Sequence, residues 1–313
     1  MSQAIRIEKL RKSFGKTVAL AEVDLDVPSG IVYGLLGPNG AGKTTAVRIL
    51  ATLLRADGGR AFVAGHDVVR EGDAVRRIIG LTGQYAALDE ALTGRENLVL
   101  IARLHGLTAR DAKRRADEML ERVGLTDAAA RSVRTYSGGM RRRVDLAASL
   151  VAHPRVLFLD EPTTGLDPAS RIALWELVGT TVRDGATVLL TSQYLEEVDR
   201  LASRLAVLDH GKVIAEGTPG ELKARAGGLV VAARVAAGMV GATMSALAEM
   251  GKVHAELDEV TVPVRGEAGL TEAMKRLGDA GIGVEEIALR RPTLDEVFLN
   301  LTTNGGPNGE KAA

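Results

Sequence analysis

The sequence contains no cysteine and no excess of charge of either sign. Without cysteine the chain forms no disulfide and offers no thiol chemistry, which fits a reducing compartment. Lysine plus arginine and aspartate plus glutamate each number 40, so the formal net charge is zero. That balance gives no electrostatic reason to expect nucleic acid or an anionic membrane surface as the main partner.

The chain also has no hydrophobic run that predicts a membrane span. Its longest apolar-rich stretch, residues 228–243, is interrupted by Arg234 and is too short to cross a bilayer. The first residues have no apolar core of signal-peptide length. We therefore expect the chain to be soluble by itself and any membrane role to depend on a partner.

Apolar runs and helical patterns predict an α/β fold, and a length of 313 residues suggests about two domains. In the first domain, placed at residues 1–226, short apolar runs typical of covered parallel strands alternate with helical patterns. From about residue 86 to 153 helical patterns dominate, which indicates a helical subdomain inserted into the sheet domain. The runs expected to be strands are 31–36, 76–81, 156–160, 187–191 and 204–209.

The character of the sequence changes near Gly227-Gly228. Residues 227–303 read in the order strand, helix, strand, strand, helix, strand, helix, which predicts a small α+β domain of the ferredoxin-like type. Residues 304–313 are rich in glycine and asparagine, and we expect them to be a disordered tail.

The segment GPNGAGKT follows an expected strand, precedes an expected helix, and fits the phosphate-binding pattern G-x-x-x-x-G-K-[ST]. Its glycines let backbone N–H groups point at a phosphate, Lys43 supplies charge to the β- and γ-phosphates, and the Thr44 hydroxyl suits Mg²⁺. An ordinary glycine-rich turn is the alternative, but every fixed position of the pattern is present. The residues expected to hold nucleotide are Gly37, Pro38, Asn39, Gly40, Ala41, Gly42, Lys43, Thr44 and Thr45.

The segment VLFLDEP is an apolar strand that ends on two carboxylates, Asp160 and Glu161. Adjacent carboxylates repel each other, so an apolar strand has little structural reason to end this way. If nucleotide lies across the same strand ends, Asp160 would hold the metal and Glu161 would be the base for an attacking water. A solvated acidic turn would be the preferred interpretation if the phosphate loop were absent.

The segment YSGGM stands before a second expected helix. A hydroxyl at Ser137, the bare N–H groups of Gly138 and Gly139, and the positive end of the helix dipole together make a second anion site. Taken alone, Ser137 would more simply be a helix cap. The sequence thus has two anion sites but the remaining catalytic residues for only one nucleotide. This suggests that each chain completes the site of a neighbouring chain.

In this order, GPNGAGKT, Gln84, YSGGM, VLFLDE and Gly165-Leu166-Asp167 resemble the nucleotide-binding subunit of an ATP-binding cassette (ABC) transporter, which is a P-loop NTPase. The resemblance covers about residues 5–216. It implies ATP and Mg²⁺ as cofactors and a homodimer in which two chains clamp two ATP molecules head to tail. It also implies that residues 85–90 contact a membrane subunit.

The resemblance further implies individual roles. Phe14 would stack on adenine, although a packed aromatic on an edge strand is an even alternative. Gln84 would sense Mg²⁺ and the attacking water, where a solvated loop amide is the plainer interpretation. Ser137 and Gly139 would touch the γ-phosphate of the ATP on the other chain, and Asp167 would communicate across the dimer. One of the arginines at 141–143 could support that same ATP.

The sequence departs from the family pattern in two places, the Ser-Gly-Gly segment and position 193. Tyr136 and Met140 flank the Ser-Gly-Gly where leucine and glutamine are usual, which leaves the phosphate-binding residues unchanged. Gln193 stands where the family normally has a histidine, and a neutral amide can donate a hydrogen bond but cannot be an acid–base group. Our hypothesis is that Gln193 positions and senses the γ-phosphate while Glu161 is the base. A polar helix cap at Gln193 is the alternative.

Gln193 within TSQYLEEVDRLA and the ending RRPTLDEVFLNLT also resemble the daunorubicin-resistance subgroup of drug-export ATPases. This implies a separately encoded integral-membrane permease, export of amphipathic antibiotics or lipids, and a position at the cytoplasmic face of the cell membrane. Leu294, Val297, Phe298 and Leu301 form one face of a helix, more often a packed domain face than a partner groove.

Two rival functions stay open at this point. A soluble ABC ATPase acting on nucleic acid or the ribosome would show a long heptad insertion or two cassettes, and this chain shows neither. A regulatory cassette with weak hydrolysis is the other rival, because Gln193 replaces the usual histidine.

Overall fold

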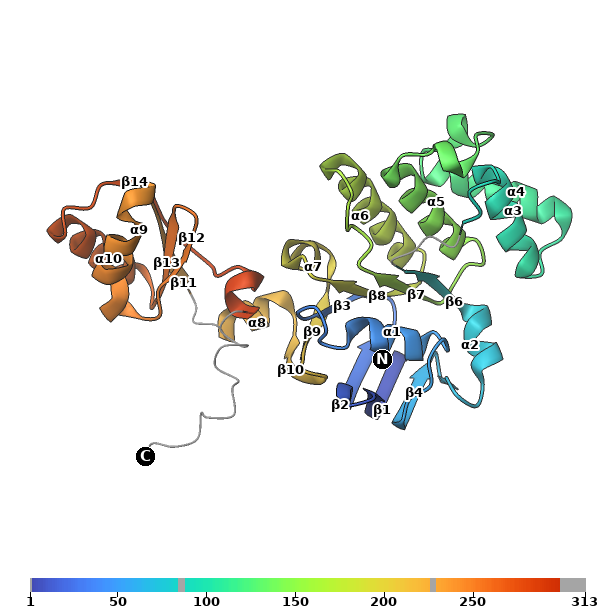
Figure 1. The fold of residues 1–313 in the computed structure, drawn as a ribbon, viewed down its shortest axis with the longest axis horizontal. Helices are drawn as coiled ribbons and strands as arrows, with labels where there is room; N and C mark the ends of the chain where they lie inside the picture. The colour runs from blue at the N-terminus through green and yellow to red at the C-terminus, as the bar shows by residue number, and fades with distance from the viewer. Residues whose placement is uncertain (1, 84–87, 226–228, 299–313) are drawn as a thin grey trace. The chain divides into compact units, whose positions relative to one another are not determined.

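The structure is a computed structural model that describes residues 2–83, 88–225 and 229–298 (Figure 1). The chain divides into two units, Met1–Glu216 and Gly217–Ala313. The boundary expected after residue 226 lies at the far end of helix α8 (Pro219–Arg225), which falls in the second unit. No helix among the described residues is both long and apolar enough to cross a bilayer.

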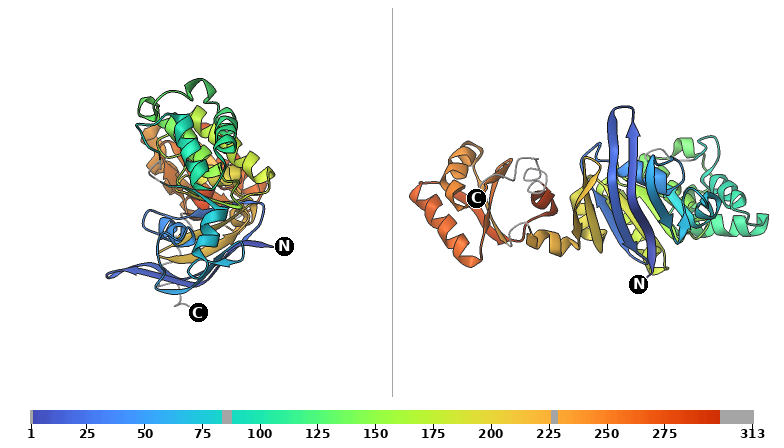
Figure 2. Two further views of the ribbon diagram at one scale, coloured as in Figure 1. Left: turned by 90° about the vertical axis from the view of Figure 1, so that its right-hand side faces the viewer. Right: turned by 90° about the horizontal axis from the view of Figure 1, so that it is seen from below.

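The first unit begins with an antiparallel sheet of strand order β2-β1-β4-β5. Figure 2 shows its long β1–β2 hairpin. Along β2, the run Val-Asp-Leu-Asp-Val alternates buried and exposed positions, as expected of a sheet with one covered face. The strands are β1 (Gln3–Phe14), β2 (Thr17–Pro28), β4 (Gly58–Val63) and β5 (His66–Asp67).

A second sheet has the order β10-β9-β3-β8-β7-β6, and its central strands run parallel. Every residue of β3, β7 and β8 is buried, which explains the apolar runs at their centres. Helix α1 (Lys43–Leu50) contributes Val47, Ile49 and Leu50 to a core that both sheets share. The strands are β3 (Val32–Leu36), β6 (Ile79–Thr82), β7 (Val156–Asp160), β8 (Thr187–Ser192), β9 (Arg204–Asp209) and β10 (Lys212–Gly217).

One expected strand is partly wrong. Of the run 76–81, residues 76–78 close helix α2 (Gly72–Ile78), and β6 starts only at Ile79. Helices α6 (Pro168–Arg183) and α7 (Leu195–Leu201) complete the first unit around the parallel sheet. The expected proline at the first position of α6 is confirmed, and Asp167 caps this helix.

Helices and no strand occupy the described residues 88–155, where the sequence predicts an inserted helical subdomain. Thr93 and Glu96 form a reciprocal capping box at the start of α3. Figure 1 shows α3, α4 and α5 gathered beyond the edge strand β6. The elements are α3 (Gly94–Leu104), α4 (Ala109–Arg122), two short 3₁₀ turns (Thr126–Ala128 and Val133–Thr135) and α5 (Gly138–Leu150).

The second unit carries an antiparallel sheet of order β12-β13-β11-β14. With two helices crossing between its strands, this is the ferredoxin-like arrangement that the sequence predicted. Two 3₁₀ turns, Ala237–Met239 and Ala248–Met250, flank α9. The elements are β11 (Leu229–Val235), α9 (Val240–Leu247), β12 (His254–Glu256), β13 (Glu259–Val264), α10 (Glu267–Asp279) and β14 (Val284–Arg290), and residues 294–298 are helical.

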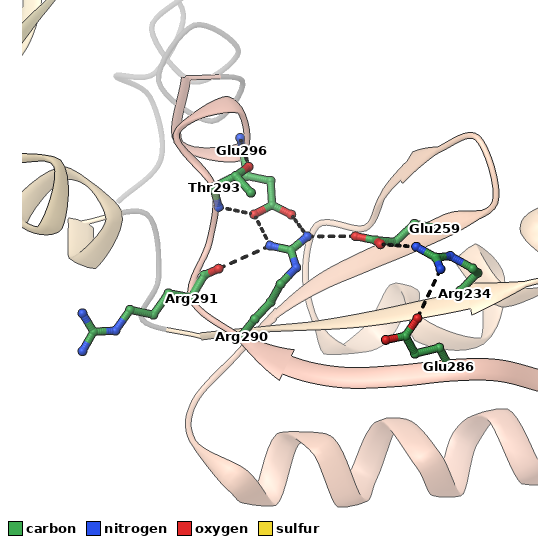
Figure 3. Close-up of polar contacts among 7 residues, drawn as sticks. All are labelled: Arg234, Glu259, Glu286, Arg290, Arg291, Thr293 and Glu296. Carbon is green, nitrogen blue, oxygen red and sulfur yellow. Dashed lines mark hydrogen bonds and ion pairs between the residues drawn. The ribbon is translucent and has the colours of Figure 1, made fainter. Parts of the chain in front are cut away.

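An ion network holds that last helical segment to its own sheet (Figure 3). Arg290 on β14 donates to both carboxylate oxygens of Glu296, at 3.0 and 2.9 Å, and to Glu259 on β13 at 2.9 Å. Leu294 and Val297 are each only 3% exposed. At Leu294 and Val297 the apolar stripe is therefore a packed face of the domain. Leu301 and the expected tail at 304–313 lie outside the described residues.

Candidate functional site

A glycine-rich loop joins β3 to α1 and leaves no room for a side chain at two of its glycines. Gly42 has a φ of 108°, and a Cβ there would lie 2.3 Å from the carbonyl oxygen of Ala19 on β2. A Cβ on Gly37 would lie 2.1 Å from the carbonyl oxygen of Leu208 on β9. The loop backbone is therefore pressed against both strands, and its outer residues 38–40 are exposed.

The rest of the expected phosphate loop leads into the helix. Ala41 is buried, and its N–H donates to the carbonyl of Pro38 at 3.1 Å. Thr44 and Thr45 lie half-buried in the first turn of α1. This turn presents the positive end of the helix dipole to the loop, which favours an anion there.

Lys43 is folded back over this loop. Its ammonium donates to the carbonyl oxygens of Gly37 at 2.6 Å and Pro38 at 3.1 Å, and it lies 3.9 Å from Oε1 of Glu161. Burial lowers the pKa of Lys43, while the charges of Glu161 and Asp160 raise it. The cation is thus held by backbone oxygens that a phosphate group can replace.

Asp160 and Thr44 meet where β7 ends beside α1. Their oxygens Oδ1 and Oγ1 are 3.1 Å apart, and Thr191 at the end of β8 donates to the same carboxylate oxygen at 2.5 Å. Two neighbouring ligands of an octahedral Mg²⁺, each at about 2.1 Å, lie about 3 Å apart. The hydroxyl and carboxylate therefore have the chemistry and spacing of two adjacent Mg²⁺ ligands.

Glu161 has a left-handed backbone with a φ of 50°, a conformation that costs a non-glycine residue roughly 1–2 kcal/mol. Its N–H donates to the carbonyl oxygen of Thr191 at 3.0 Å, which fixes the turn to β8. The side chain is only 13% exposed and faces the ammonium of Lys43. Phosphate loop, metal pair and second carboxylate thus converge at the carboxyl ends of β3, β7 and β8.

Comparison with known proteins identifies this arrangement. A profile of the family described as "ABC transporter" matches residues 20–164. The chain is 57% identical to the daunorubicin resistance ATP-binding protein DrrA3 of Streptomyces coeruleorubidus, over 96% of each chain. This chain belongs to the ABC transporter family.

A second relative and a solved structure agree. The daunorubicin/doxorubicin resistance ATP-binding protein DrrA of Streptomyces peucetius is 51% identical over 96% of this chain and 93% of its own length. A solved ATP-binding cassette, a dimer in a post-hydrolysis state with ADP and Pi, superimposes with a TM-score of 0.63 at 25% identity, covering 68% of this chain and 98% of that one. The resemblance to ABC ATP-binding subunits of drug resistance systems is therefore confirmed.

The Ser-Gly-Gly segment of this ABC protein opens helix α5. Ser137 caps the helix by accepting from the N–H of Met140 at 3.2 Å, and it and Gly138 are exposed. Gly139 is buried, and a Cβ there would lie 2.5 Å from the hydroxyl oxygen of Ser170. The hydroxyl of Ser170 also donates to Oδ2 of Asp167 at 2.7 Å. Gly139 and Asp167 therefore lie beside each other within one chain.

Tyr136, which departs from the family pattern beside the Ser-Gly-Gly segment, has a structural role. Its ring is buried, and its hydroxyl donates to the carbonyl of Ala128 at 2.7 Å. A Cβ on Gly94 at the start of α3 would lie 2.4 Å from that hydroxyl. Tyr136 therefore connects the segment before α5 with the start of α3 and with the 3₁₀ turn Thr126–Ala128.

Phe14 ends strand β1 and is 51% exposed, so the packed-aromatic alternative is excluded. The ammonium of Lys12 lies 5.4 Å from the centre of its ring, a cation–π arrangement. The ring is thus available for stacking.

Of the two glutamines expected at the site, Gln84 and Gln193, only Gln193 lies within the described residues. It is half-buried between β8 and α7. The residue that caps α7 is Tyr194, with no side-chain cap bond, so the helix-cap alternative for Gln193 is wrong. Gln84 and residues 85–87 lie outside the described residues, and Glu90, at the end of the expected permease contact, binds Arg141 at 3.2 Å.

Sequence reasoning missed a buried carboxylate behind the site. Glu197 on α7 is 1% exposed and accepts from Thr163 at 3.1 Å, Trp175 at 3.1 Å and Ser192 at 2.7 Å. Burial raises its pKa, while its hydrogen bonds and the charge of Arg171 lower it. Thr191 and Ser192 therefore end β8 for different reasons, since Thr191 orients Asp160 and Ser192 binds Glu197. A glutamate on the apolar side of α7 is the one signal that could have revealed this.

Proposed function

We propose that this ABC protein hydrolyses ATP in a head-to-tail pair with a second copy of itself, and so energises export of amphipathic antibiotics or lipids through a separate permease. The observation that carries the proposal is the meeting of Lys43, Thr44, Asp160 and Glu161 at the strand ends. The drug-export part draws on relatives named as daunorubicin and doxorubicin resistance proteins. The protein would then act at the cytoplasmic face of the cell membrane, bound to its permease.

The phosphate loop binds the triphosphate. Lys43 exchanges its bonds to two backbone carbonyls for phosphate oxygens, so its positive charge moves little on binding. Loop N–H groups and the first turn of α1 add partial positive charge around the β-phosphate. Phe14 offers its exposed ring to the adenine.

Thr44 and Asp160 are the residues that would hold Mg²⁺, and Thr191 orients the carboxylate. Mg²⁺ bound there supplies neutralisation of the charge on the β- and γ-phosphate oxygens. Gln84 is the further ligand expected from the family pattern.

Glu161 is the general base. Its carboxylate is shielded from solvent and faces the γ-phosphate side of the loop, next to the Lys43 ammonium, where it accepts the proton of an attacking water. Gln193 donates its amide to the γ-phosphate or to Glu161 and contributes no titration of its own.

A second chain completes each site. The exposed hydroxyl of Ser137 and the backbone of Gly138 and Gly139, at the start of α5, bind the γ-phosphate held by the neighbouring chain. Asp167, packed beside Gly139, relays between the two sites.

Two measurements test the proposal. Steady-state ATPase activity of the wild type should exceed that of Glu161→Gln by about 10²–10⁴-fold, and the variant should accumulate as an ATP-bound dimer in size-exclusion chromatography. If both proteins turn over ATP equally slowly, the regulatory-cassette alternative, which Gln193 favours, replaces hydrolysis.

The export part is tested by affinity purification from detergent-solubilised native membranes. We expect a stoichiometric polytopic membrane protein to co-purify. Ribosomal proteins or nucleic acid in its place would refute the transport role and favour a soluble machine.

A further inference from the structure

Arg142 is a largely buried arginine whose hydrogen bonds run to backbone carbonyls, and its Nη1 also lies 3.7 Å from Oδ2 of Asp145. It extends from α5, four residues beyond the start of the helix, and its side chain is only 12% exposed. Its Nε donates to the carbonyl of Pro162 at 2.8 Å, and Nη1 donates to that of Gly83 at 2.5 Å. Its Nη2 donates to the carbonyl of Glu161 at 3.1 Å and lies 3.4 Å from that of Asp160. One guanidinium thus holds the backbone that follows two neighbouring strands, β6 and β7.

One of the carbonyls that Arg142 binds belongs to Glu161, whose backbone conformation requires support from its surroundings. Glu161 has the left-handed backbone described above, and such conformations persist only where surrounding contacts impose them. The Thr191 carbonyl fixes the N–H side of Glu161, and Arg142 binds its carbonyl side. Since the backbone sets the direction of the carboxylate, Arg142 helps to aim the expected base.

The two neighbouring arginines have other partners. Arg141 pairs with Glu90 at 3.2 Å and with the carbonyl of Arg134 at 3.3 Å. Arg143 donates to the carbonyl of Val123 at 2.9 Å, inside the helical subdomain, so we assign it no part in the nucleotide site. Of the three, Arg142 is the one whose bonds run from α5 to the strand ends.

We propose that Arg142 is a positioning residue that links the Ser-Gly-Gly end of α5 to the backbone of Glu161. A shift of α5, as its first turn engages the ATP of the neighbouring chain, then moves the Pro162 and Glu161 carbonyls with it. The base reaches its working direction when the neighbouring site is occupied. This inference rests on the proposed function, because it takes Glu161 as the base and α5 as the contact to the second ATP.

The test separates binding from turnover. ATP affinity and steady-state kcat are measured for the wild type, Arg142→Met and Arg142→Lys, with Arg143→Met as the matched control on the same helix. In Arg142→Met we expect kcat to fall by about 10- to 100-fold while Kd for ATP changes by less than about 2-fold. Arg142→Lys should fall between the two, because an ammonium has fewer fixed donors than the planar guanidinium. Arg143→Met should keep kcat within about 2-fold of the wild type.

A second readout excludes a general loss of structure. In the Glu161→Gln background the base is already absent, so adding Arg142→Met should leave ATP-driven dimerisation unchanged. The inference is overturned if Arg142→Met retains wild-type kcat, if Kd and kcat change together, or if Arg143→Met loses as much activity. Should Arg142→Met fail to fold, Arg142→Lys must show the same division between kcat and Kd, and wild-type kcat in it overturns the inference. If the wild type itself shows no more turnover than Glu161→Gln, the proposed function fails instead.

Discussion

Replacing Glu197 tests whether the buried carboxylate holds the two catalytic strand ends together. In Glu197→Ala, the Trp175 indole and the hydroxyls of Thr163 and Ser192 lose their acceptor. Each orphaned buried donor costs about 1–3 kcal/mol, and hydroxyls recover part of this by rotating, so we expect a total loss of about 3–5 kcal/mol. For a unit of this size, that corresponds to a fall in Tm of about 10 °C.

Glu197→Gln is the matched control. Its amide oxygen can accept from the indole, and its NH₂ can donate to the two hydroxyls, since a hydroxyl both donates and accepts. We therefore expect this variant to lose less than about 1 kcal/mol of the free energy of unfolding. Thermal and urea unfolding of the three proteins decide between the two cases. If Glu197→Gln lowers the free energy of unfolding as much as Glu197→Ala does, the three hydrogen bonds to the Glu197 side chain do not stabilise the fold as described.

The pH dependence of unfolding gives an independent check. The pKa of Glu197 is raised on folding, so between its unfolded and folded values the folded state binds the proton more tightly. The free energy of unfolding from this group therefore falls as pH rises through that window, by at most about 1.4 kcal/mol per pH unit. It is constant above the folded pKa, and Glu197→Gln should lack this component. If the free energy of unfolding of the wild type rises more steeply with pH than that of Glu197→Gln over the same window, the result would contradict the reasoning.

Three further substitutions address the site. Thr191→Val removes the hydroxyl that orients Asp160, so the Mg²⁺ concentration for half-maximal ATPase activity should rise about 10- to 100-fold; an unchanged requirement would remove Asp160 from the metal site. Gly42→Ala places a Cβ 2.3 Å from the Ala19 carbonyl and should abolish ATP binding in titration calorimetry, and retained affinity would show that the loop is not tightly pressed against β2. The pH–rate profile of the wild type should show no group of pKa about 6–7, and a His in place of Gln193 should introduce one; such a group already present in the wild type would contradict the role given to the glutamine.

Much of this architecture follows from local patterns. The strands β3, β7 and β8 were predicted because parallel strands covered on both faces are continuous apolar runs. The phosphate loop was predicted because its glycines, lysine and threonine sit at fixed spacing between a strand and a helix. The ferredoxin-like order followed from the alternation of apolar runs in the last third of the chain.

What was missed depends on contacts between distant segments. Nothing near Arg142 in the sequence indicates that it binds the carbonyls of Gly83 and Pro162, because packing of α5 over the strand ends creates that contact. Glu197 likewise finds Thr163 and Trp175 only when α6 and α7 pack beside β8. The strand expected at 76–81 was predicted to begin too early, because Arg76 and Arg77 belong to the last turn of α2. The apolar residues that follow them do not show in the sequence where the helix ends and the strand begins.

The contact between Tyr136 and Gly94 has an evolutionary consequence. Because the tyrosine hydroxyl occupies the space where a Cβ on residue 94 would stand, the two positions cannot change independently. A descendant with leucine at 136 would leave the Ala128 carbonyl without its donor and open space beside α3. That space would permit a larger residue at 94, so the two substitutions should be acquired together, with either one alone selected against.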